Sequence, residues 1–322
     1  MDAKKITQII TYYNEEKYIA ACIQSLLNQT YQNLEIIAIS DGSTDNGPEI
    51  VASFDDSRIV MINNPDNHGQ GYCRNQGLDM ATGDYVGFFD GDDISYLNRL
   101  EFLASYLDSH EDIFCVSCDY ECIDENGNIY EEKHPKVLTD INEIRANFLI
   151  GCPVGCSCAL FRRKLVEEYH IRELVGCKTA EDYHFWLQCL PYARFVNVDM
   201  PLFYYRQHNS QSKIAEKSNV NKHQEWMEYV FKFAWESRGF EISDMDIEFV
   251  YTHLYKCNLL WWPHDIVKAI VFRKKIAKQL STMKLVETNE IVGMINERLY
   301  ILIPYLFPIR FYRRHRKMLV NN

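Results

Sequence analysis

The chain has 322 residues, of which 47% are hydrophobic and 25% are charged, so it can form one large or two modest domains with an ample core. Its net charge of −11 excludes the usual basic type of nucleic-acid-binding protein, and we expect no nucleic-acid partner. Eleven cysteines, an odd number, and the lack of an apolar N-terminal segment predict a reducing, cytoplasmic location.

The first 100 residues alternate between strand-like and helix-like patterns. Runs of apolar and β-branched residues predict strands at 6–12, 34–39, 58–62 and 85–89. Helical spacing of apolar residues predicts a helix capped by Asn14, another after the turn at 41–45, and a third within 69–81. This alternation predicts an α/β fold with a doubly wound, mostly parallel sheet.

The rest of the chain divides into a mixed middle part and a helical end. Strands are predicted at 113–120, 157–161, 195–198 and 202–206, with a hairpin turn at 125–128 and a helix at 181–190. From about residue 214 the pattern is helical. We therefore expect one domain at 1–212, followed by a helical C-terminal region at 213–322.

The most informative motif is Asp90-Gly91-Asp92-Asp93, which directly follows the strand-like run 85–89. Clustered carboxylates repel one another and are costly unless a cation or hydrogen-bond donors neutralise them. Oxygen ligands suit Mg²⁺ or Mn²⁺, and Mg²⁺ usually shares its shell with substrate phosphates. The alternative is an acidic turn that caps a helix, because Asp favours both positions.

Polar residues also follow the two earlier strands. Thr11-Tyr12-Tyr13-Asn14 ends the first strand, and the Ser-Asp-Gly-Ser-Thr-Asp run at 40–45 ends the second. In a parallel sheet these ends lie beside the acidic cluster, at the edge where open α/β sheets bind ligands. An aromatic face, a carboxylate acceptor and a cation site together suit a nucleotide diphosphate.

Two other patterns carry less weight. The stretches 115–122 and 152–158 each hold three cysteines with loose zinc-like spacing, but neither forms a pair of CxxC motifs. Buried thiols behave as small apolar groups, and we favour that interpretation. Gly69-Gln70-Gly71 lacks the third glycine of a dinucleotide-binding loop, because Arg74 stands in its place, which argues against a nicotinamide dehydrogenase.

Several runs occur together in one order along the chain. They are residues 12–19, 22–31, 33–37, 41–45, 74–78 and the acidic cluster at 90–93. In this order they resemble the family 2 inverting glycosyltransferases of GT-A fold, and the resemblance covers about residues 5–210. It implies a Rossmann-like GT-A catalytic domain at 1–212, with a nucleotide-binding half at 1–100 and an acceptor half at 101–212.

The resemblance implies roles for single residues in donor binding. Thr11 and Tyr13 are expected to border the uracil of a UDP-sugar, with the Tyr13 ring stacked on it. Asp41 is expected to accept a hydrogen bond from the uracil imide, and Arg74 to lie near the base or the diphosphate. Asp92 is expected to contact the ribose or the water shell of the metal. A core role for Tyr13 and a helix-surface position for Arg74 stay open as alternatives.

The resemblance also implies a metal, Mn²⁺ or Mg²⁺, with Asp93 as a ligand. His208, in the Tyr-Arg-Gln-His run at 205–208, is expected near the diphosphate or the metal. Asp182 is the implied catalytic base, which takes a proton from the acceptor hydroxyl. Glu181 is an alternative base or an acceptor contact. Taken without the resemblance, both acids complement the dipole at a helix N-terminus.

The expected function is an inverting, metal-dependent transfer of a sugar from a UDP-sugar to a glycan or lipid-linked acceptor, in surface polysaccharide biosynthesis. One alternative is a sugar-1-phosphate nucleotidyltransferase, which would need a basic, glycine-rich loop where residues 13–16 stand. Another is a non-catalytic scaffold that binds nucleotide sugars, which would be expected to have lost Asp93 or Asp182. The pathway rests on analogy with the family alone.

The end of the chain is basic and apolar. Residues 305–322 carry five Arg and Lys residues and no acid, and aromatic and aliphatic side chains alternate with them. Such a segment can lie on an anionic membrane, so residues 305–317 are expected to place the protein on the inner face of the cell membrane. The alternative is a helix packed on the domain with a solvated tail. No stretch reaches the roughly 20 apolar residues of a membrane span.

Overall fold

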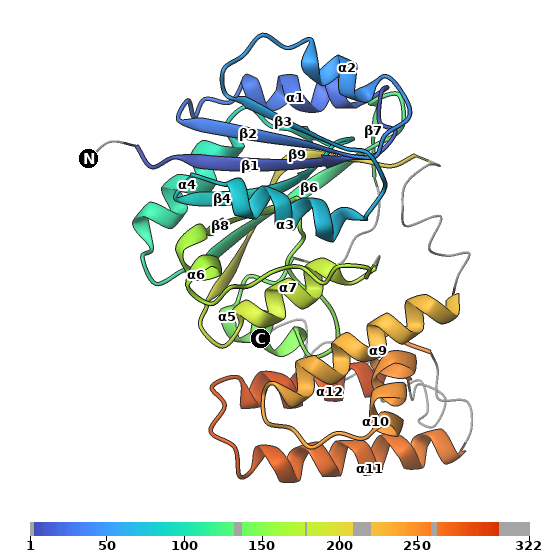
Figure 1. The fold of residues 1–322 in the computed structure, drawn as a ribbon. Coiled ribbons are helices and arrows are strands. Elements are labelled where there is room, and N and C mark those ends of the chain that lie inside the picture. Colours follow the sequence, from blue (N-terminus) through green and yellow to red (C-terminus); the bar gives the residue numbers. More distant parts are fainter. Residues whose placement is uncertain (1–2, 132–136, 178, 209–219, 259–262, 303–322) are drawn as a thin grey trace. The chain divides into compact units, whose positions relative to one another are not determined.

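The computed structural model describes residues 3–131, 137–177, 179–208, 220–258 and 263–302 (Figure 1). The chain forms two compact units. Unit 1 comprises residues 1–144 and 152–226, and unit 2 comprises residues 145–151 and 227–322. The boundary expected between residues 212 and 213 lies outside the described residues.

Unit 1 is built on one mixed sheet. Its described strands are β1 (Ile6–Tyr12), β2 (Leu34–Asp41), β3 (Ile59–Asn64), β4 (Tyr85–Asp90), β5 (Ile94–Ser95), β6 (Cys115–Ile123), β7 (Ile129–Tyr130), β8 (Ala159–Arg162) and β9 (Phe195–Arg206). They lie in the order β3-β2-β1-β4-β8-β6-β9-β5, and β7 pairs with β6. The first four in this order are parallel, whereas β8 is antiparallel to both neighbours. The expected α/β class with a mostly parallel sheet is confirmed.

The second half of the sheet departs from the prediction at one strand. β9 is continuous, although the sequence predicts two short strands there. The pattern is interrupted at residues 199–201, which are exposed, and Pro201 cannot donate a ladder hydrogen bond. The register with β6 shifts near this point, so a β-bulge absorbs the irregularity. The hairpin at 125–128 is confirmed, because β6 and β7 pair antiparallel across it.

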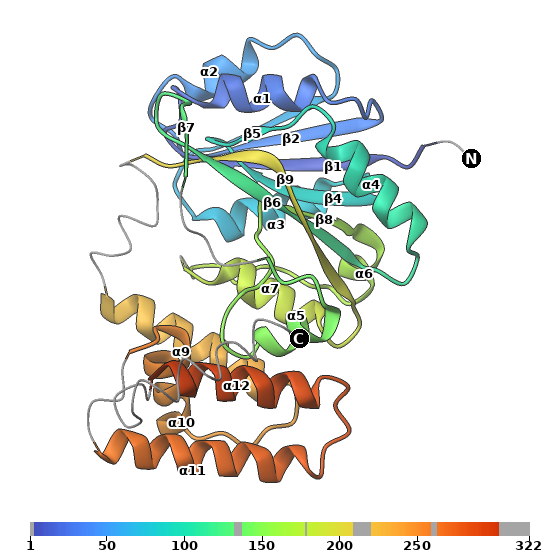
Figure 2. The same ribbon diagram turned by 180° about the vertical axis from the view of Figure 1, so that it is seen from behind.

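Helices cover both faces of the sheet. They are α1 (Ile19–Leu27), α2 (Gly47–Ala52), α3 (Gln70–Met80), α4 (Arg99–Ser109), α6 (Arg163–Glu168) and α7 (Glu181–Cys189), while α5 (Ile141–Asn147) crosses the boundary between the units. α1 and α4 lie on one face, and α3 and α7 lie on the other (Figure 1, Figure 2). Because neighbouring side chains of a strand point to opposite faces, Phe89 joins the core under α1 and α4, whereas Phe88 packs edge-on against Phe185 of α7.

The first helix begins later than predicted. α1 starts at Ile19, and Asn14 is not its cap but adopts a left-handed conformation with φ of 55°. The Asn14 side-chain oxygen accepts a hydrogen bond from the Thr44 backbone N–H at 2.8 Å, and the Asn14 N–H donates to Ser43 Oγ at 3.1 Å. Asn tolerates this conformation better than other non-glycine residues. Asn14 therefore joins the loop after β1 to the loop after β2.

The C-terminal part is helical in its described residues, as predicted. The elements are α9 (Val220–Glu236), α10 (Asp244–Phe249), the π-helix η1 (Val250–Tyr255), α11 (Pro263–Leu280) and α12 (Thr288–Leu302). Unit 2 packs around Trp235, whose indole N–H donates to the Leu149 carbonyl at 2.9 Å. Among the described residues, no helix is both long and apolar enough to cross a membrane. The basic segment 305–317 lies outside the described residues.

The core under α1 and α4 generates a stability prediction. Leu103 of α4 is 0% exposed, and we expect Leu103→Ala to lower the free energy of unfolding by about 2–5 kcal/mol through lost burial and a residual cavity. Leu97, which is 59% exposed, provides the matched control. Leu97→Ala should change the free energy of unfolding by less than about 0.5 kcal/mol. Denaturant unfolding measures both, and equal effects would contradict this description of the core.

Candidate functional site

The ends of β1, β2 and β4 meet at one edge of the sheet, as the sequence predicts. Thr11 pairs in register with Ile39 on one side and with Asp90 on the other. The acidic turn folds back onto β1, because the Gly91 N–H donates to the Thr11 carbonyl at 3.2 Å. A Cβ at Gly91 would lie 2.7 Å from Tyr12 Cβ, so this close approach requires glycine.

The two residues expected to border the uracil differ in exposure. The Tyr13 side chain is 47% exposed and so is not a core residue, which leaves its ring available for stacking. Thr11 is 3% exposed, and its hydroxyl has no hydrogen-bond partner among the residues that the structure describes. A buried hydroxyl without a partner can bind a polar ligand atom at little further cost.

Asp41 has a structural role that the sequence analysis did not predict. Its carboxylate oxygens accept the backbone N–H groups of His68 at 2.8 Å and Gly69 at 2.9 Å. The Asn67 amide donates to the Asp41 carbonyl at 3.2 Å, which adds a third contact. Asp41 thus holds the loop that leads into α3. A carboxylate oxygen has two lone pairs, so a hydrogen bond to a ligand remains possible.

Arg74 is buried, which rules out the helix-surface alternative. It is 2% exposed, and its Nη2 donates to Asp90 Oδ1 at 2.9 Å while its Nη1 lies 3.4 Å from Glu173 Oε1. Asp90 Oδ2 also accepts the Ser157 hydroxyl at 3.0 Å. Arg74 and Ser157 therefore neutralise the first carboxylate of the acidic cluster. Glu173 was not predicted as a site residue, because an isolated acid in a loop carries no signal in the sequence.

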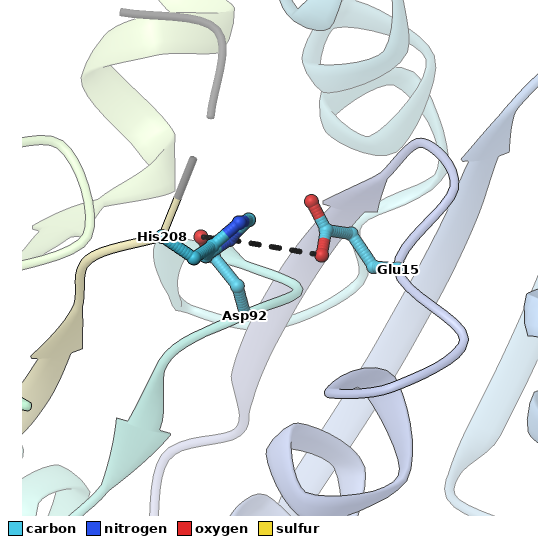
Figure 3. Close-up of side chains that lie close together, drawn as sticks. All are labelled: Glu15, Asp92 and His208. Carbon is cyan, nitrogen blue, oxygen red and sulfur yellow. Dashed lines mark hydrogen bonds and ion pairs between the residues drawn. The ribbon is translucent and has the colours of Figure 1, made fainter. Parts of the chain in front are cut away.

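A group of candidate metal ligands, referred to as the metal-binding group, forms where the loop after β1, the acidic turn and the end of β9 meet (Figure 3). It consists of Glu15, Asp92 and His208, whose ligand atoms all lie within 4.8 Å of one another. His208 Nε2 lies 3.0 Å from Asp92 Oδ2 and 3.9 Å from Glu15 Oε2. Two carboxylates and an imidazole are a donor set that suits Mn²⁺, and also Mg²⁺ with its oxygen preference met by the two acids.

Burial and neighbouring charges shift the pKa values of two members of this group. Burial, and then the charge of Asp92, raises the pKa of Glu15 to about 7. The hydrogen bond with Asp92 raises the pKa of His208 above 6.5, although burial opposes this. Both shifts favour the protonated forms, with which a bound cation would compete. Sequence analysis missed Glu15, although it lies only two residues after Tyr13.

Asp93 is not one of the three residues of this group. It is 0% exposed, and its Oδ1 accepts the backbone N–H of Arg206 at 3.0 Å. The Arg206 guanidinium returns a hydrogen bond from Nε to the Asp92 carbonyl at 2.9 Å. These contacts fix the end of β9 against the acidic turn. They thereby place His208, two residues further on, beside Asp92.

The two expected acceptor-side acids differ in burial. α7 begins at Glu181, which is 8% exposed, and Asp182 is half-buried with its Oδ1 accepting the Tyr183 N–H at 2.7 Å. Burial, then the charges of Asp182 and Glu173, raises the pKa of Glu181 to about 8. The raised pKa favours the protonated form of Glu181, which can donate a hydrogen bond.

The cysteines form no comparable site. All eleven are free thiols, and burial raises the pKa of Cys115 and Cys158 well above the usual value. In the described part of the chain, the metal-binding group contains no cysteine. The interpretation of buried thiols as small apolar groups agrees with the three cysteines at 115–122 and with Cys158, whereas Cys152 is exposed and Cys156 is partly exposed.

Two solved structures share the fold of this chain. S. aureus TarS 1–349 in complex with UDP-GlcNAc superposes with a TM-score of 0.60 at 19% identity, covering 92% of this chain and 81% of that one. The mannosyltransferase PcManGT from Pyrobaculum calidifontis, in complex with GDP-Man and Mn²⁺, gives a TM-score of 0.55 at 15% identity, covering 94% and 87%. These similarities confirm the GT-A fold.

The sequence itself also has relatives of known class. The Escherichia coli enzyme UDP-Glc:alpha-D-GlcNAc-diphosphoundecaprenol beta-1,3-glucosyltransferase WfgD is 30% identical over 226 residues, which cover 70% of this chain and 85% of WfgD. The profile of glycosyl transferase family 2 matches residues 7–170, about half of the chain. The chain is a glycosyltransferase and belongs to glycosyl transferase family 2.

Proposed function

We propose that this glycosyltransferase moves a sugar from a UDP-sugar to a hydroxyl of a glycan or lipid-linked acceptor, with inversion at the anomeric carbon. The observation that carries the proposal is the group Glu15–Asp92–His208 at the sheet edge where Thr11 and Asp41 also end their strands. The names of WfgD and TarS, which include UDP-Glc and UDP-GlcNAc, support a UDP-linked donor.

We assign the metal, Mn²⁺ or Mg²⁺, to Asp92 and His208, with Glu15 as the third protein group. The mutual distances and donor types of these side chains support this assignment, and PcManGT was solved with Mn²⁺. Asp93, which the sequence predicts as a metal ligand together with His208, accepts the Arg206 backbone N–H, and we propose that it fixes β9. When bound, the cation would offset charge on the departing diphosphate.

For the acceptor side we propose Asp182 as the base. Its half-buried carboxylate at the start of α7 can take the proton of the acceptor hydroxyl as that oxygen attacks the sugar. A single displacement of this kind inverts the anomeric centre and needs no enzyme nucleophile. The raised pKa of Glu181 leaves its carboxyl able to donate a hydrogen bond to the acceptor.

The alternatives are less well supported. A sugar-1-phosphate nucleotidyltransferase would need basic donors in the loop after β1, but that loop carries Glu15 within the metal-binding group. A non-catalytic scaffold would not need both an acid at position 182 and the candidate metal ligands Glu15, Asp92 and His208. We therefore retain the transferase. The acceptor in the name of WfgD, a diphosphoundecaprenol-linked sugar, supports a lipid-linked acceptor, and we propose surface polysaccharide biosynthesis by analogy with the family alone.

Peripheral membrane contact, with the protein in the cytoplasm, is part of this proposal. Residues 305–317 lie outside the described residues, but α11 offers independent support. Val267, Ile270 and Val271 are 58%, 48% and 59% exposed on it, and Lys274 and Lys278 are exposed along the same side of the helix. Exposed aliphatic side chains beside lysines suit an anionic lipid surface.

The first prediction from the proposed function concerns the donor site. We expect UDP to bind with Mn²⁺ and much more weakly without it, and Asp92→Asn to weaken the metal-dependent binding by about tenfold or more. Asp182→Asn should leave UDP affinity within about twofold but lower the turnover of UDP-sugars by roughly 10²–10⁴-fold. Titration calorimetry and release of UDP from a panel of UDP-sugars measure these effects.

The matched control is Asp93→Asn, which keeps an oxygen to accept the Arg206 N–H. It should retain Mn²⁺-dependent UDP binding. Loss of that binding in Asp93→Asn, with Asp92→Asn unaffected, would return the ligand role to Asp93. Absence of UDP binding with every divalent metal tested would contradict the proposed donor.

A second prediction concerns pH. Because Mn²⁺ needs the deprotonated forms of Glu15 and His208, and both pKa values are raised, its affinity should increase as the pH rises from about 6 to 8. His208→Gln should bind Mn²⁺ more weakly at pH 8 and show a smaller pH dependence. Equilibrium titration with Mn²⁺ at several pH values measures this, and a pH-independent affinity in the wild type would contradict it.

The third prediction concerns the membrane. The double variant Lys274→Glu and Lys278→Glu should reduce binding to phosphatidylglycerol vesicles by about tenfold or more, because each lysine near the surface contributes about 1 kcal/mol. Deleting residues 305–322 should reduce it further. Lys232→Glu, which alters a lysine paired with Asp244 at 2.8 Å, is the control and should have little effect. Vesicle sedimentation measures binding, and unchanged binding in both test variants would contradict membrane contact.

A further inference from the structure

Glu173 is a buried acid that the mechanism above does not use. It lies in the irregular segment 171–177 between α6 and α7, and its side chain is 0% exposed. A buried carboxylate is costly unless specific contacts compensate it. The contacts that compensate the Glu173 carboxylate therefore indicate which parts of the structure this residue holds together.

Helix α3 holds the Glu173 backbone and side chain. The Asn75 amide donates to the Glu173 carbonyl at 2.9 Å, and the Glu173 N–H donates to Asn75 Oδ1 at 2.8 Å. Arg74 Nη1 reaches Glu173 Oε1 at 3.4 Å. A Cβ at Gly71 would lie 3.3 Å from Glu173 Oε2, so the segment packs closely on the first turns of α3.

The same segment is tied to the helix that carries the proposed base. Gln188 of α7 donates from its side-chain amide to the Arg172 carbonyl at 2.8 Å, one residue before Glu173. The charge of Asp182 also raises the pKa of Glu173. The segment therefore lies between α3 and α7 with contacts to both.

On its other side, Arg74 connects to the donor half of the site. Its Nη2 binds Asp90 Oδ1 at 2.9 Å, at the end of the strand that leads to Asp92. The contacts from Glu173 through Arg74 to Asp90 thus join the segment 171–177 to the acidic turn. They form a charged link between the nucleotide-binding half and the acceptor half of the domain.

We infer that Glu173 is a positioning residue. It acts through Arg74 to hold α7, the helix that carries Asp182, in a fixed position relative to the donor site. This inference rests on the proposed role of Asp182. The carboxylate does not touch the substrate. Its charge orients the Arg74 guanidinium between the two halves, and a displaced base of even 1 Å can cost about 10²-fold in rate.

The environment of Glu173 predicts a pH dependence for this link. The charged and titratable groups that face it are Arg74, Asp90, Cys156, Glu181 and Asp182. Burial, which outweighs the opposing effect of Arg74, raises the pKa of Glu173 to about 7. The ion pair with Arg74 is thus present above this pH and is lost as the pH falls through it. Because the folded state disfavours the ionised form, Glu173→Gln should not lower thermal stability at pH 8.

The test compares Glu173→Gln with Asp79→Asn. Asp79 makes the exposed ion pair with Arg172 at 2.6 Å, so it joins α3 to the same segment without burial. With Mn²⁺ at pH 8, we expect Glu173→Gln to lower kcat for UDP release from UDP-sugars by about tenfold or more and to leave the UDP Kd within about twofold. Asp79→Asn should change neither. Glu173→Asp should recover part of the lost turnover.

Two further readouts decide among the outcomes. The acid limb of the wild-type kcat profile near pH 7 should flatten in Glu173→Gln, and amide hydrogen exchange in residues 171–189 should become faster. Wild-type kcat and exchange in Glu173→Gln would overturn the inference, and so would equal losses of kcat, UDP affinity and thermal stability. If the wild type neither binds UDP nor releases it, the proposed function fails, and hydrogen exchange still decides whether Glu173 holds the segment.

Discussion

Repulsion among carboxylates at one edge of the sheet is the constraint on which the site depends. Each acid there is stabilised by a different set of partners. Asp41 accepts backbone N–H groups of the loop before α3, Asp90 binds a buried guanidinium and a hydroxyl, and Asp93 accepts a backbone N–H from the end of β9. Asp92 is left beside His208, where a cation can complete the neutralisation.

The same contacts assemble the site from distant parts of the chain. The loop after β1 is joined to the loop after β2 through Asn14, and the end of β9 is joined to the acidic turn through Asp93. Glu15 and His208 are separated by nearly the whole catalytic unit in sequence, yet they face each other because of these two connections. Neutralisation and positioning are therefore carried out by the same hydrogen bonds.

Burial separates the tasks of the acids on the acceptor side. Glu181 and Glu173 are almost fully buried and have raised pKa values, whereas Asp182, whose charge contributes to both shifts, is half-buried. An acid that keeps its proton can donate a hydrogen bond, and one that is ionised can accept a proton. The proposed division of roles follows from this difference, since the three side chains are otherwise chemically alike.

The sequence by itself determined the α/β class, the parallel strands β1 to β4, the helical C-terminal part and the family, because local periodicity and ordered motifs carry that information. The tertiary structure alone decided that β9 is continuous, that Arg74 is buried, and that Glu15 and Glu173 join the site. Each of these depends on pairing between segments far apart in the chain. Such pairing is set by sheet register and side-chain packing, which leave no periodic trace in the local sequence.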